Sequence, residues 1–322
     1  MHSFSPAIWE RNPHFQSILG SMKFRLSNKN KMIETSKEMI IDAGNGVRLQ
    51  GYYSHQPSAV PKGLVTLIHG WEGSSDSTYI QSTGHYLFEK GYDIFRLNLR
   101  DHGNSHHLNE GIFHCTLIEE TFQAVFNISQ LADSMPYYIV GFSLGGNFSL
   151  RIALMLQPSQ IPNLSRIFCI SPPLDPYKVT LAIDKGLPIY RIYFLNKWKR
   201  SLLKKQSLFP GRYDFQNILK EKTCMSLTEA IMPYHPDFSD YREYFKHYTL
   251  MGNVFRSLAI PVTIITSEDD PIVPVMDFHN LGQNDNLQIL IQRHGGHCGF
   301  LYFFPFRCWY ERTIAHMLMK EQ

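Results

Sequence analysis

Short apolar runs alternate with longer amphipathic segments along most of the chain. The β-prone runs predict strands at 64–68, 93–99, 137–140, 166–171 and 262–266, followed by one more at 287–291. Helical patterns predict helices at 77–90 and 117–133, directly after 143, near 274–282 and near 308–320. Strands that alternate with helices favour an α/β fold, in which a mostly parallel sheet carries helices on both faces.

Two parts of the chain depart from this alternation. Residues 38–42 and 47–53 flank a glycine-rich turn at 43–46, which predicts a β-hairpin. Later, the alternation stops at Pro172-Pro173 and resumes only at 261, after a stretch of mostly helical, aromatic and basic character. This insertion precedes strand 262–266, and its simplest interpretation is a helical cap, or lid, over the sheet. The predicted organisation is an N-terminal extension (1–35) packed on the core, a core (36–172 and 257–322) and a cap (173–256).

Composition narrows the class of protein. The 322 residues are 43% hydrophobic and 18% charged, which is typical of a globular domain. A net charge of +3 gives no support for a nucleic-acid partner. The sequence has no apolar run of about 18 residues and no basic, then apolar, leader at its start, so we expect a cytoplasmic protein. Its five irregularly spaced cysteines fit a reducing compartment.

A G-x-S-x-G pattern lies at residues 141–145, between a predicted strand and a predicted helix. In this position the pattern is typical of a nucleophile elbow, a strained turn that exposes a serine at the carboxyl end of a sheet. Gly141 and Gly145 fit because a side chain at either position would collide with neighbouring backbone. Ser143 is therefore the candidate nucleophile. The pattern alone also fits an ordinary glycine-rich loop, so its partners matter.

An activated serine needs a base to accept its proton and an acid to orient that base. Two adjacent aspartates follow strand 262–266, on the edge of the sheet where Ser143 is expected. Asp270 is the preferred acid because its spacing to Val273-Pro274 matches the usual acid loop of this fold. Asp269 is the alternative, and either carboxylate could instead cap the helix predicted near 274–282.

The candidate base follows the last predicted strand. His297 comes after Gly295-Gly296, and these glycines permit a close approach to the serine. His294 is the alternative, although it lies nearer to the strand. The chain order Ser143, Asp270, His297 is the order found in α/β-hydrolases.

The oxyanion that forms on attack needs two fixed N–H donors. One is expected from Leu144, the residue after the nucleophile, and the other from the loop that follows strand 64–68. That loop begins His69-Gly70-Trp71, and because Gly70 lets the chain turn inward, the Trp71 N–H is the predicted second donor. The Trp71 side chain could line an acyl pocket or pack beneath the cap.

Together these motifs resemble the YheT-like branch of the α/β-hydrolases, the abhydrolase-domain esterases and lipases. The resemblance extends over nearly the whole chain and rests on the segments at 12–17, 69–75, 98–109, 141–146, 171–176 and 295–300. It implies the α/β-hydrolase fold, hydrolysis of carboxylic esters, and acyl transfer to alcohols in some relatives. It also implies that Ser143, Asp270 and His297 form the triad. Ser17 stands where threonine is expected, a departure that we expect to affect no catalytic residue.

Two other chemistries are weighed and set aside. Histidines and a cysteine crowd one loop, namely His102, His106, His107, His114 and Cys115. They lack the paired spacing of a zinc site, so we expect no metal and assign them to loop hydrogen bonds and a cleft wall. Cys298 adjoins the base, but neighbouring side chains on an extended segment point to opposite faces, which argues against a cysteine nucleophile.

The predicted cap carries a basic segment without acidic residues. Its charged residues are Lys185, Arg191, Lys197, Lys199, Arg200, Lys204 and Lys205. This segment could seat the cap on an anionic membrane, or it could be a helix with one packed and one solvated face. The apolar run 300–306 is interpreted mainly as packing of the last helix, with a contribution to the acyl pocket as the other option.

These observations predict a serine hydrolase that cleaves carboxylic esters with apolar acyl chains through an acyl-enzyme on Ser143. It needs no cofactor, and its expected partner is a small ester or lipid, with peripheral membrane contact through the basic cap as an option. Two alternatives stay open: an acyltransferase with the same triad and an alcohol or lipid acceptor, and a non-catalytic ligand-binding protein of hydrolase fold. The sequence leaves the oligomeric state open.

Overall fold

The computed structural model describes residues 3–26, 29–57, 60–156, 160–161 and 163–320. Its central sheet has eight strands in the order β1-β2-β4-β3-β5-β6-β7-β8. The strands are β1 (Ser36–Asp42), β2 (Arg48–Ser54), β3 (Leu64–Ile68), β4 (Asp93–Leu97), β5 (Tyr137–Phe142), β6 (Leu164–Ile170), β7 (Val262–Ser267) and β8 (Leu287–Gln292). Strands β1 and β2 form the predicted hairpin and pair antiparallel, and β2 also pairs antiparallel with β4. The six strands from β3 to β8 are parallel to one another. The prediction of a mostly parallel sheet is therefore confirmed.

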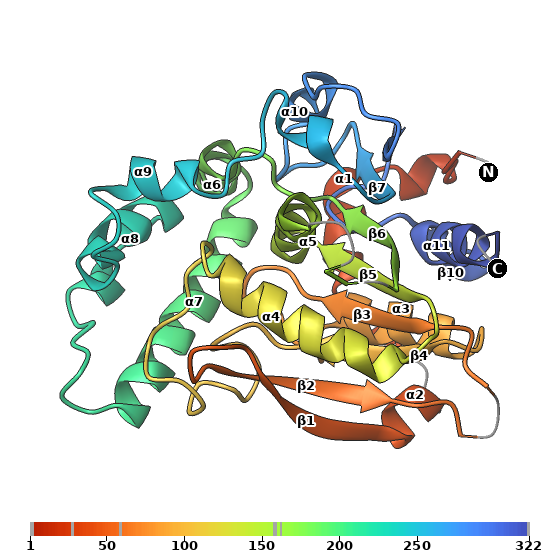
Figure 1. Ribbon diagram of the computed structural model, residues 1–322. Coiled ribbons are helices and arrows are strands. Elements are labelled where there is room, and N and C mark those ends of the chain that lie inside the picture. The colour runs from red at the N-terminus through yellow and green to blue at the C-terminus, as the bar shows by residue number, and fades with distance from the viewer. Residues whose placement is uncertain (1–2, 27–28, 58–59, 157–159, 162, 321–322) are drawn as a thin grey trace.

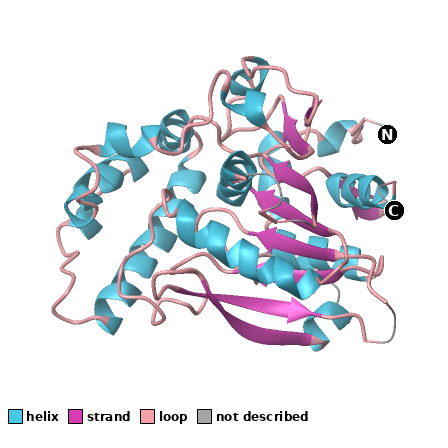
Figure 2. Ribbon diagram, viewed as in Figure 1, coloured by secondary structure: helices cyan, strands magenta, loops and turns pink. Residues whose placement is uncertain are grey.

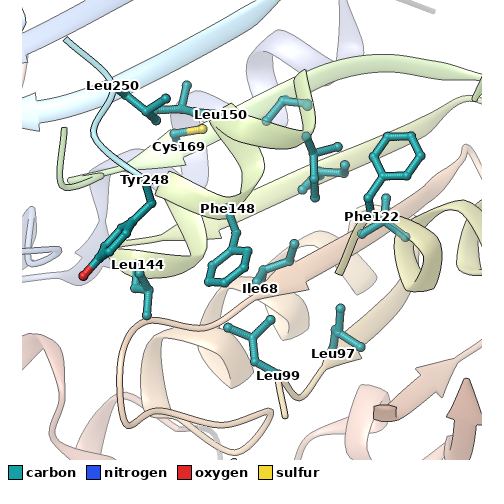
Figure 3. Close-up of a cluster of buried hydrophobic side chains, with 14 of the residues drawn as sticks. Ile68, Leu97, Leu99, Phe122, Leu144, Phe148, Leu150, Cys169, Tyr248 and Leu250 are labelled. Carbon is teal, nitrogen blue, oxygen red and sulfur yellow. The ribbon is translucent and has the colours of Figure 1, made fainter. Parts of the chain in front are cut away.

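Helices cover both faces of the sheet (Figures 1 and 2). They are α4 (Ile118–Ser129) and α5 (Leu144–Met155) on one face, and α3 (Thr78–Phe88) and α11 (Trp309–Met319) on the other. Strand β3 illustrates why the sequence of a central strand is a continuous apolar run. Its Leu64 and Ile68 pack toward α4 and α5, while Val65 and Leu67 pack toward α3 and α11. Figure 3 shows Ile68 beside Phe148 of α5 in the first of these clusters.

Between β6 and β7 the chain leaves the sheet and forms the cap elements. These are α6 (Pro176–Lys185), α7 (Pro188–Leu208), η4 (Ile218–Lys220), α8 (Cys224–Ile231), η5 (Met232–Tyr234), α9 (Tyr241–Lys246) and η6 (Val254–Ser257). Helices α6 to α9 gather beyond the carboxyl ends of the parallel strands (Figure 1). The helical insertion expected before strand 262–266, which is β7, is thus present.

A buried ion pair fixes the C-terminal half of α7 to the core. Lys205 Nζ lies 2.8 Å from Asp101 Oδ1 and also donates to the carbonyl oxygens of His106 and Asn109. Both charged side chains are almost completely buried. Protein groups therefore replace water as the hydrogen-bond partners of each charge. This half of α7 is therefore rigidly attached.

The residues before β1 pack against the C-terminal part of the chain. They form η1 (Ile8–Glu10), α1 (Pro13–Gly20), η2 (Lys23–Arg25) and α2 (Lys31–Glu34). The buried Gln16 side chain donates to Glu10 O and Leu301 O and accepts from Leu301 N. Arg25 pairs with Glu311 of α11 at 3.2 Å. These long-range bonds hold the N-terminal segment in place.

Two C-terminal segments differ from the sequence expectation. The helix predicted near 274–282 is only α10 (Met276–His279), because Gly282 N instead donates to the Gly252 carbonyl. The apolar run 300–306 does not simply pack the last helix, because part of it pairs as the two-stranded hairpin of β9 (Leu301–Phe303) and β10 (Phe306–Cys308). Leu301 is buried there, whereas Phe304 at the turn is 87% exposed. The remaining short element is η3 (Gln130–Ala132).

Candidate active site

Ser143 lies in the sharp turn between β5 and α5, with φ 49° and ψ −118°. A non-glycine residue in this region is strained and persists only where its surroundings impose it. Its surroundings are tight: a Cβ on Gly141 would lie 2.3 Å from Gly145 O, and one on Gly145 would lie 2.3 Å from Ile68 O. Both glycines are required by contact, as the pattern predicted. The Ser143 N–H donates to Ile170 O of β6, which fixes the turn.

A series of hydrogen bonds runs from Ser143 through His297 to Asp270. His297 Nε2 lies 2.9 Å from Ser143 Oγ, and its Nδ1 lies 2.9 Å from Asp270 Oδ2. The other oxygen of the buried Asp270 carboxylate accepts from the N–H groups of Ile272 and Val273. With Nδ1 protonated and donating to the carboxylate, Nε2 is free to accept the serine proton.

The two alternative residues pair with each other instead. Asp269 Oδ2 lies 3.4 Å from His294 Nδ1, and Asp269 Oδ1 accepts from the N–H of Gly296. The Asp269–His294 pair therefore braces the loop that leads into His297. The structure brings Ser143, Asp270 and His297 together and leaves Asp269 and His294 beside them.

The two N–H groups predicted to hold an oxyanion flank Ser143. A Cβ on Gly70 would lie 3.1 Å from Ser143 Cβ, so the loop that carries Trp71 passes directly over the serine. Within the parts of the chain that the structure describes, neither the Trp71 N–H nor the Leu144 N–H has an acceptor. By contrast, the N–H groups of Gly70, Glu72 and Gly73 all donate within the protein. The Trp71 and Leu144 donors are thus available to a ligand.

Tyr79 and two buried histidines hold the Trp71 loop. Gly70 N donates to Tyr79 Oη at 3.0 Å, and Glu72 N donates to His102 Nε2 at 3.2 Å. His102 Nδ1 donates in turn to Arg100 O. Burial lowers the pKa of His102 to about 4 and holds the pKa of His69 well below its usual value. Both rings are therefore neutral at pH 7, as a ring that accepts a backbone N–H must be.

Sequence reasoning assigned no role to Ser17, but the structure places its hydroxyl beside the candidate base. Ser17 Oγ accepts the backbone N–H of His297 at 2.8 Å and donates to Pro13 O at 2.6 Å. The N-terminal segment therefore helps to position the loop that carries His297. A threonine would keep the same hydroxyl, which explains how Ser17 can stand where threonine is expected.

Two histidines of the loop considered for a metal have structural partners. His106 Nε2 lies 2.8 Å from Ser201 Oγ of α7, and His114 Nδ1 lies 2.7 Å from Thr116 Oγ1. Burial raises the pKa of the Cys298 thiol, so the sulfur stays protonated and is a poor nucleophile. No group of three His, Cys, Asp or Glu residues suits a metal ion in the described stretches of the chain.

A cavity of about 560 Å³ opens from Ser143 and His297 into the space beneath the cap. Its walls are mainly apolar, with side chains such as Ile183, Phe194, Trp198, Phe245 and Ile272. The Trp71 ring stacks on Phe194 at 5.1 Å and meets Trp198 edge-on at 5.2 Å. Trp71 therefore both packs against the cap and lines the cavity. Such walls favour a ligand with a hydrocarbon segment.

The elbow, the sheet order and the inserted cap define a protein of the α/β-hydrolase class. The family model described as "alpha/beta hydrolase fold" matches residues 63–303, so the chain belongs to this family. In the described parts of the chain, no helix combines the length and the apolar character of a membrane span.

Relatives within this class are distant but cover most of the chain. Phospholipase ABHD3 of Bos taurus is 22% identical over 312 residues, which span 93% of this chain and 73% of that protein. An abhydrolase domain-containing protein of Dictyostelium discoideum is 22% identical, and the match spans 98% of this chain and 80% of that protein. The solved esterase Pf2001 of Pyrococcus furiosus superposes with a TM-score of 0.57 at 15% identity, over 92% and 96% of the two chains. This structural likeness shows the fold alone.

Proposed function

We propose that the protein is a serine hydrolase that cleaves carboxylic esters through an acyl-enzyme on Ser143. The observation that carries this proposal is the unbroken series from Asp270 through His297 to Ser143, with both distances at 2.9 Å. Its serine end opens into the apolar cavity. Relatives named phospholipase support a hydrolase of the esterase or lipase type.

In the acylation step, Ser143 Oγ attacks the ester carbonyl carbon while His297 Nε2 takes the hydroxyl proton. The buried Asp270 carboxylate stabilises the imidazolium that forms and keeps its ring oriented. The carbonyl oxygen gains negative charge within reach of the Trp71 and Leu144 N–H groups, for which the described residues offer no competing acceptor. Collapse of the intermediate breaks the ester bond, and His297 returns the proton to the departing alcohol.

In the deacylation step, water enters the place of the alcohol. His297 takes a proton from that water, and the hydroxide attacks the acyl carbon held on Ser143. The same two N–H groups hold the second oxyanion. Release of the carboxylic acid restores the serine hydroxyl and the neutral imidazole.

The cavity supports a substrate with an apolar acyl chain. Aliphatic and aromatic side chains from the cap and the core form most of its wall, and its volume of about 560 Å³ suits a chain of lipid type. Relatives named phospholipase add support for a lipid ester. The motifs at 12–17 and 69–75 further support membership of the YheT-like branch, and a cytoplasmic location stays a prediction.

The test is covalent labelling with a fluorophosphonate probe, which reacts only with an activated serine. We expect the wild type to be labelled and Ser143→Ala and His297→Ala to remain unlabelled although folded. Hydrolysis of p-nitrophenyl esters should fall by about 10⁶ in Ser143→Ala if the triad acts as a unit. A folded wild type that is neither labelled nor active would favour the ligand-binding alternative, whereas ester products in the presence of added alcohol would favour acyl transfer.

A further inference from the structure

Apolar side chains surround the mouth of the cavity. Ile18 and Met22 of the N-terminal segment line the cavity and are also exposed to solvent. The same is true of Ile189 and Tyr193 on α7. A side chain can line a cavity and still contact solvent only where the cavity opens. The mouth therefore lies between the N-terminal segment and the first turns of α7.

The apolar surface continues on both sides of this mouth. On the N-terminal side, the exposed Trp9 contacts Phe303 and the exposed Phe304 of the β9–β10 hairpin, and Phe15 also contacts Phe303. On the cap side, Ile192 is exposed and shares one helix face with Ile189.

A hydrogen bond links the two sides, because His14 Nδ1 lies 2.9 Å from Tyr190 Oη. We call the exposed parts of Trp9, Ile18, Met22, Ile189, Ile192 and Phe304 the mouth surface. It gathers exposed apolar side chains from segments that are far apart in the sequence, and Ile18, Met22 and Ile189 among them also line the cavity.

Most of the charges around the mouth surface are positive. The segments that form it, residues 3–25, 185–200 and 301–308, contain one acidic residue, Glu10. Glu10 is buried, and its carboxylate accepts from the N–H groups of Ala7 and Phe303. The basic residues Arg11, Lys23, Lys185 and Arg307 are exposed on the same segments.

Two acidic residues outside these segments lie close to them, because Asp184 directly precedes Lys185 and the exposed Asp76 lines the cavity. Asp76 lies 3.3 Å from Arg96, and Asp184 accepts from the first N–H groups of α8. Among the described residues, the exposed Arg11, Lys23, Lys185 and Arg307 form no ion pair, so their positive charge is available to an anionic partner. A second copy of the chain would bring this positive charge against itself, whereas an anionic partner complements it.

We propose that the mouth surface docks on a lipid membrane that contains anionic lipids. The apolar side chains enter the interfacial region, the basic residues lie against the anionic headgroups, and the cavity opens directly toward the bilayer. This inference rests on the proposed function for its purpose, since a docked mouth lets an acyl chain enter the cavity without crossing water.

The docking site differs from the basic cap segment that the sequence suggested. Much of that segment binds inward: Lys197 Nζ donates to Glu72 O, Lys199 Nζ to Glu221 O, and Lys205 is buried against Asp101. These lysines are not free to contact lipid. The N-terminal segment and the β9–β10 hairpin contribute at least as much as the cap.

The experiment measures sedimentation of the full chain with vesicles of phosphatidylcholine, with and without phosphatidylglycerol. The apolar variant is Trp9→Ser/Ile192→Ser/Phe304→Ser, because these residues are exposed and do not line the cavity. The charge variant is Lys185→Glu/Arg307→Glu. Matched controls are Ile40→Ser/Leu203→Ser/Leu208→Ser and Lys37→Glu/Lys222→Glu, which change exposed residues elsewhere.

We expect the wild type to bind the anionic vesicles, and to bind them less tightly at high salt. The charge variant should bind at least about 25-fold more weakly, since each basic residue near an anionic surface contributes about 1 kcal/mol. The apolar variant should lose about tenfold or more, by loss of buried apolar area. Both controls should bind within about twofold of the wild type.

Turnover of a soluble p-nitrophenyl ester separates the two proposals. Normal turnover in all variants, with vesicle binding lost only in the mouth variants, supports docking. Normal turnover with no wild-type binding, or with equal binding by the mouth variants, overturns docking and leaves the proposed function intact. A wild-type dimer in solution that the mouth variants dissociate would assign the surface to a second copy and also overturn it.

Discussion

Replacing Asp270 by asparagine tests the order of hydrogen bonds in the candidate triad. Asp270 Oδ1 accepts from two backbone N–H groups, those of Ile272 and Val273. The asparagine carbonyl oxygen must take that position, because an NH2 group cannot accept. The amide NH2 then faces His297 Nδ1, where the carboxylate Oδ2 was.

This arrangement forces the wrong tautomer on His297. With an NH2 group donating to Nδ1, the ring proton must move to Nε2, which then points at Ser143 Oγ. The nitrogen that should accept the serine proton is no longer free. A substitution of this kind in a serine triad lowers kcat by about 10⁴, which corresponds to about 5 kcal/mol of transition-state stabilisation.

The assay is kcat and kcat/KM on a soluble p-nitrophenyl ester, with thermal unfolding as a check on the fold. Asp269→Asn is the matched control, because Asp269 contacts Gly296 N and His294 rather than His297. We expect this control to lose less than about tenfold. The reasoning is refuted if folded Asp270→Asn retains a tenth of the wild-type kcat, or if Asp269→Asn loses as much as Asp270→Asn.

Three further results are expected. His102→Leu removes the acceptor of the Glu72 N–H and loosens the loop of Trp71. We therefore expect kcat to fall by about tenfold to a hundredfold with little change in KM. The control is His107→Leu, which changes an exposed histidine and should have no effect. Lys205→Met leaves the buried Asp101 carboxylate unpaired and should lower the free energy of unfolding by about 3–5 kcal/mol in urea titrations. Burial lowers the pKa of His102 to about 4, and the unfolded side chain titrates near 6.5, so the unfolded state binds more protons between these values. The urea midpoint should therefore fall more steeply in the wild type than in His102→Leu as pH drops from about 6.5 toward 4, and an equal fall in the two proteins would contradict the buried neutral ring.

The sheet could be predicted because its signal is local. Each parallel strand is buried on both faces, so runs such as 64–68 appear as continuous apolar segments in the sequence. The elbow glycines could also be predicted, since the strained turn excludes side chains at Gly141 and Gly145. The preference for His297 and Asp270 followed from chain order and spacing, and the structure brings both to Ser143.

The parts that escaped prediction depend on contacts between distant segments. Nothing near His102 in the sequence indicates that its Nε2 accepts the Glu72 N–H, thirty positions away. The bond from His297 N to Ser17 Oγ joins the two ends of the chain. The run 300–306 was ambiguous because apolar residues fit a buried helix contact and an exposed hairpin equally well.

The N-terminal segment contributes both to the position of His297 and to the mouth of the cavity. Its Ser17 holds the backbone N–H of His297, while Ile18, one residue further along α1, lies at the cavity mouth. On a helix, neighbouring residues point in different directions, so one turn of α1 can face the candidate base and the opening at the same time. A displacement of the mouth surface would therefore move helix α1, and Ser17 of α1 is hydrogen-bonded directly to the backbone N–H of His297. If the mouth docks on a membrane, the same helix places the lipid entrance and the candidate base in a fixed relation.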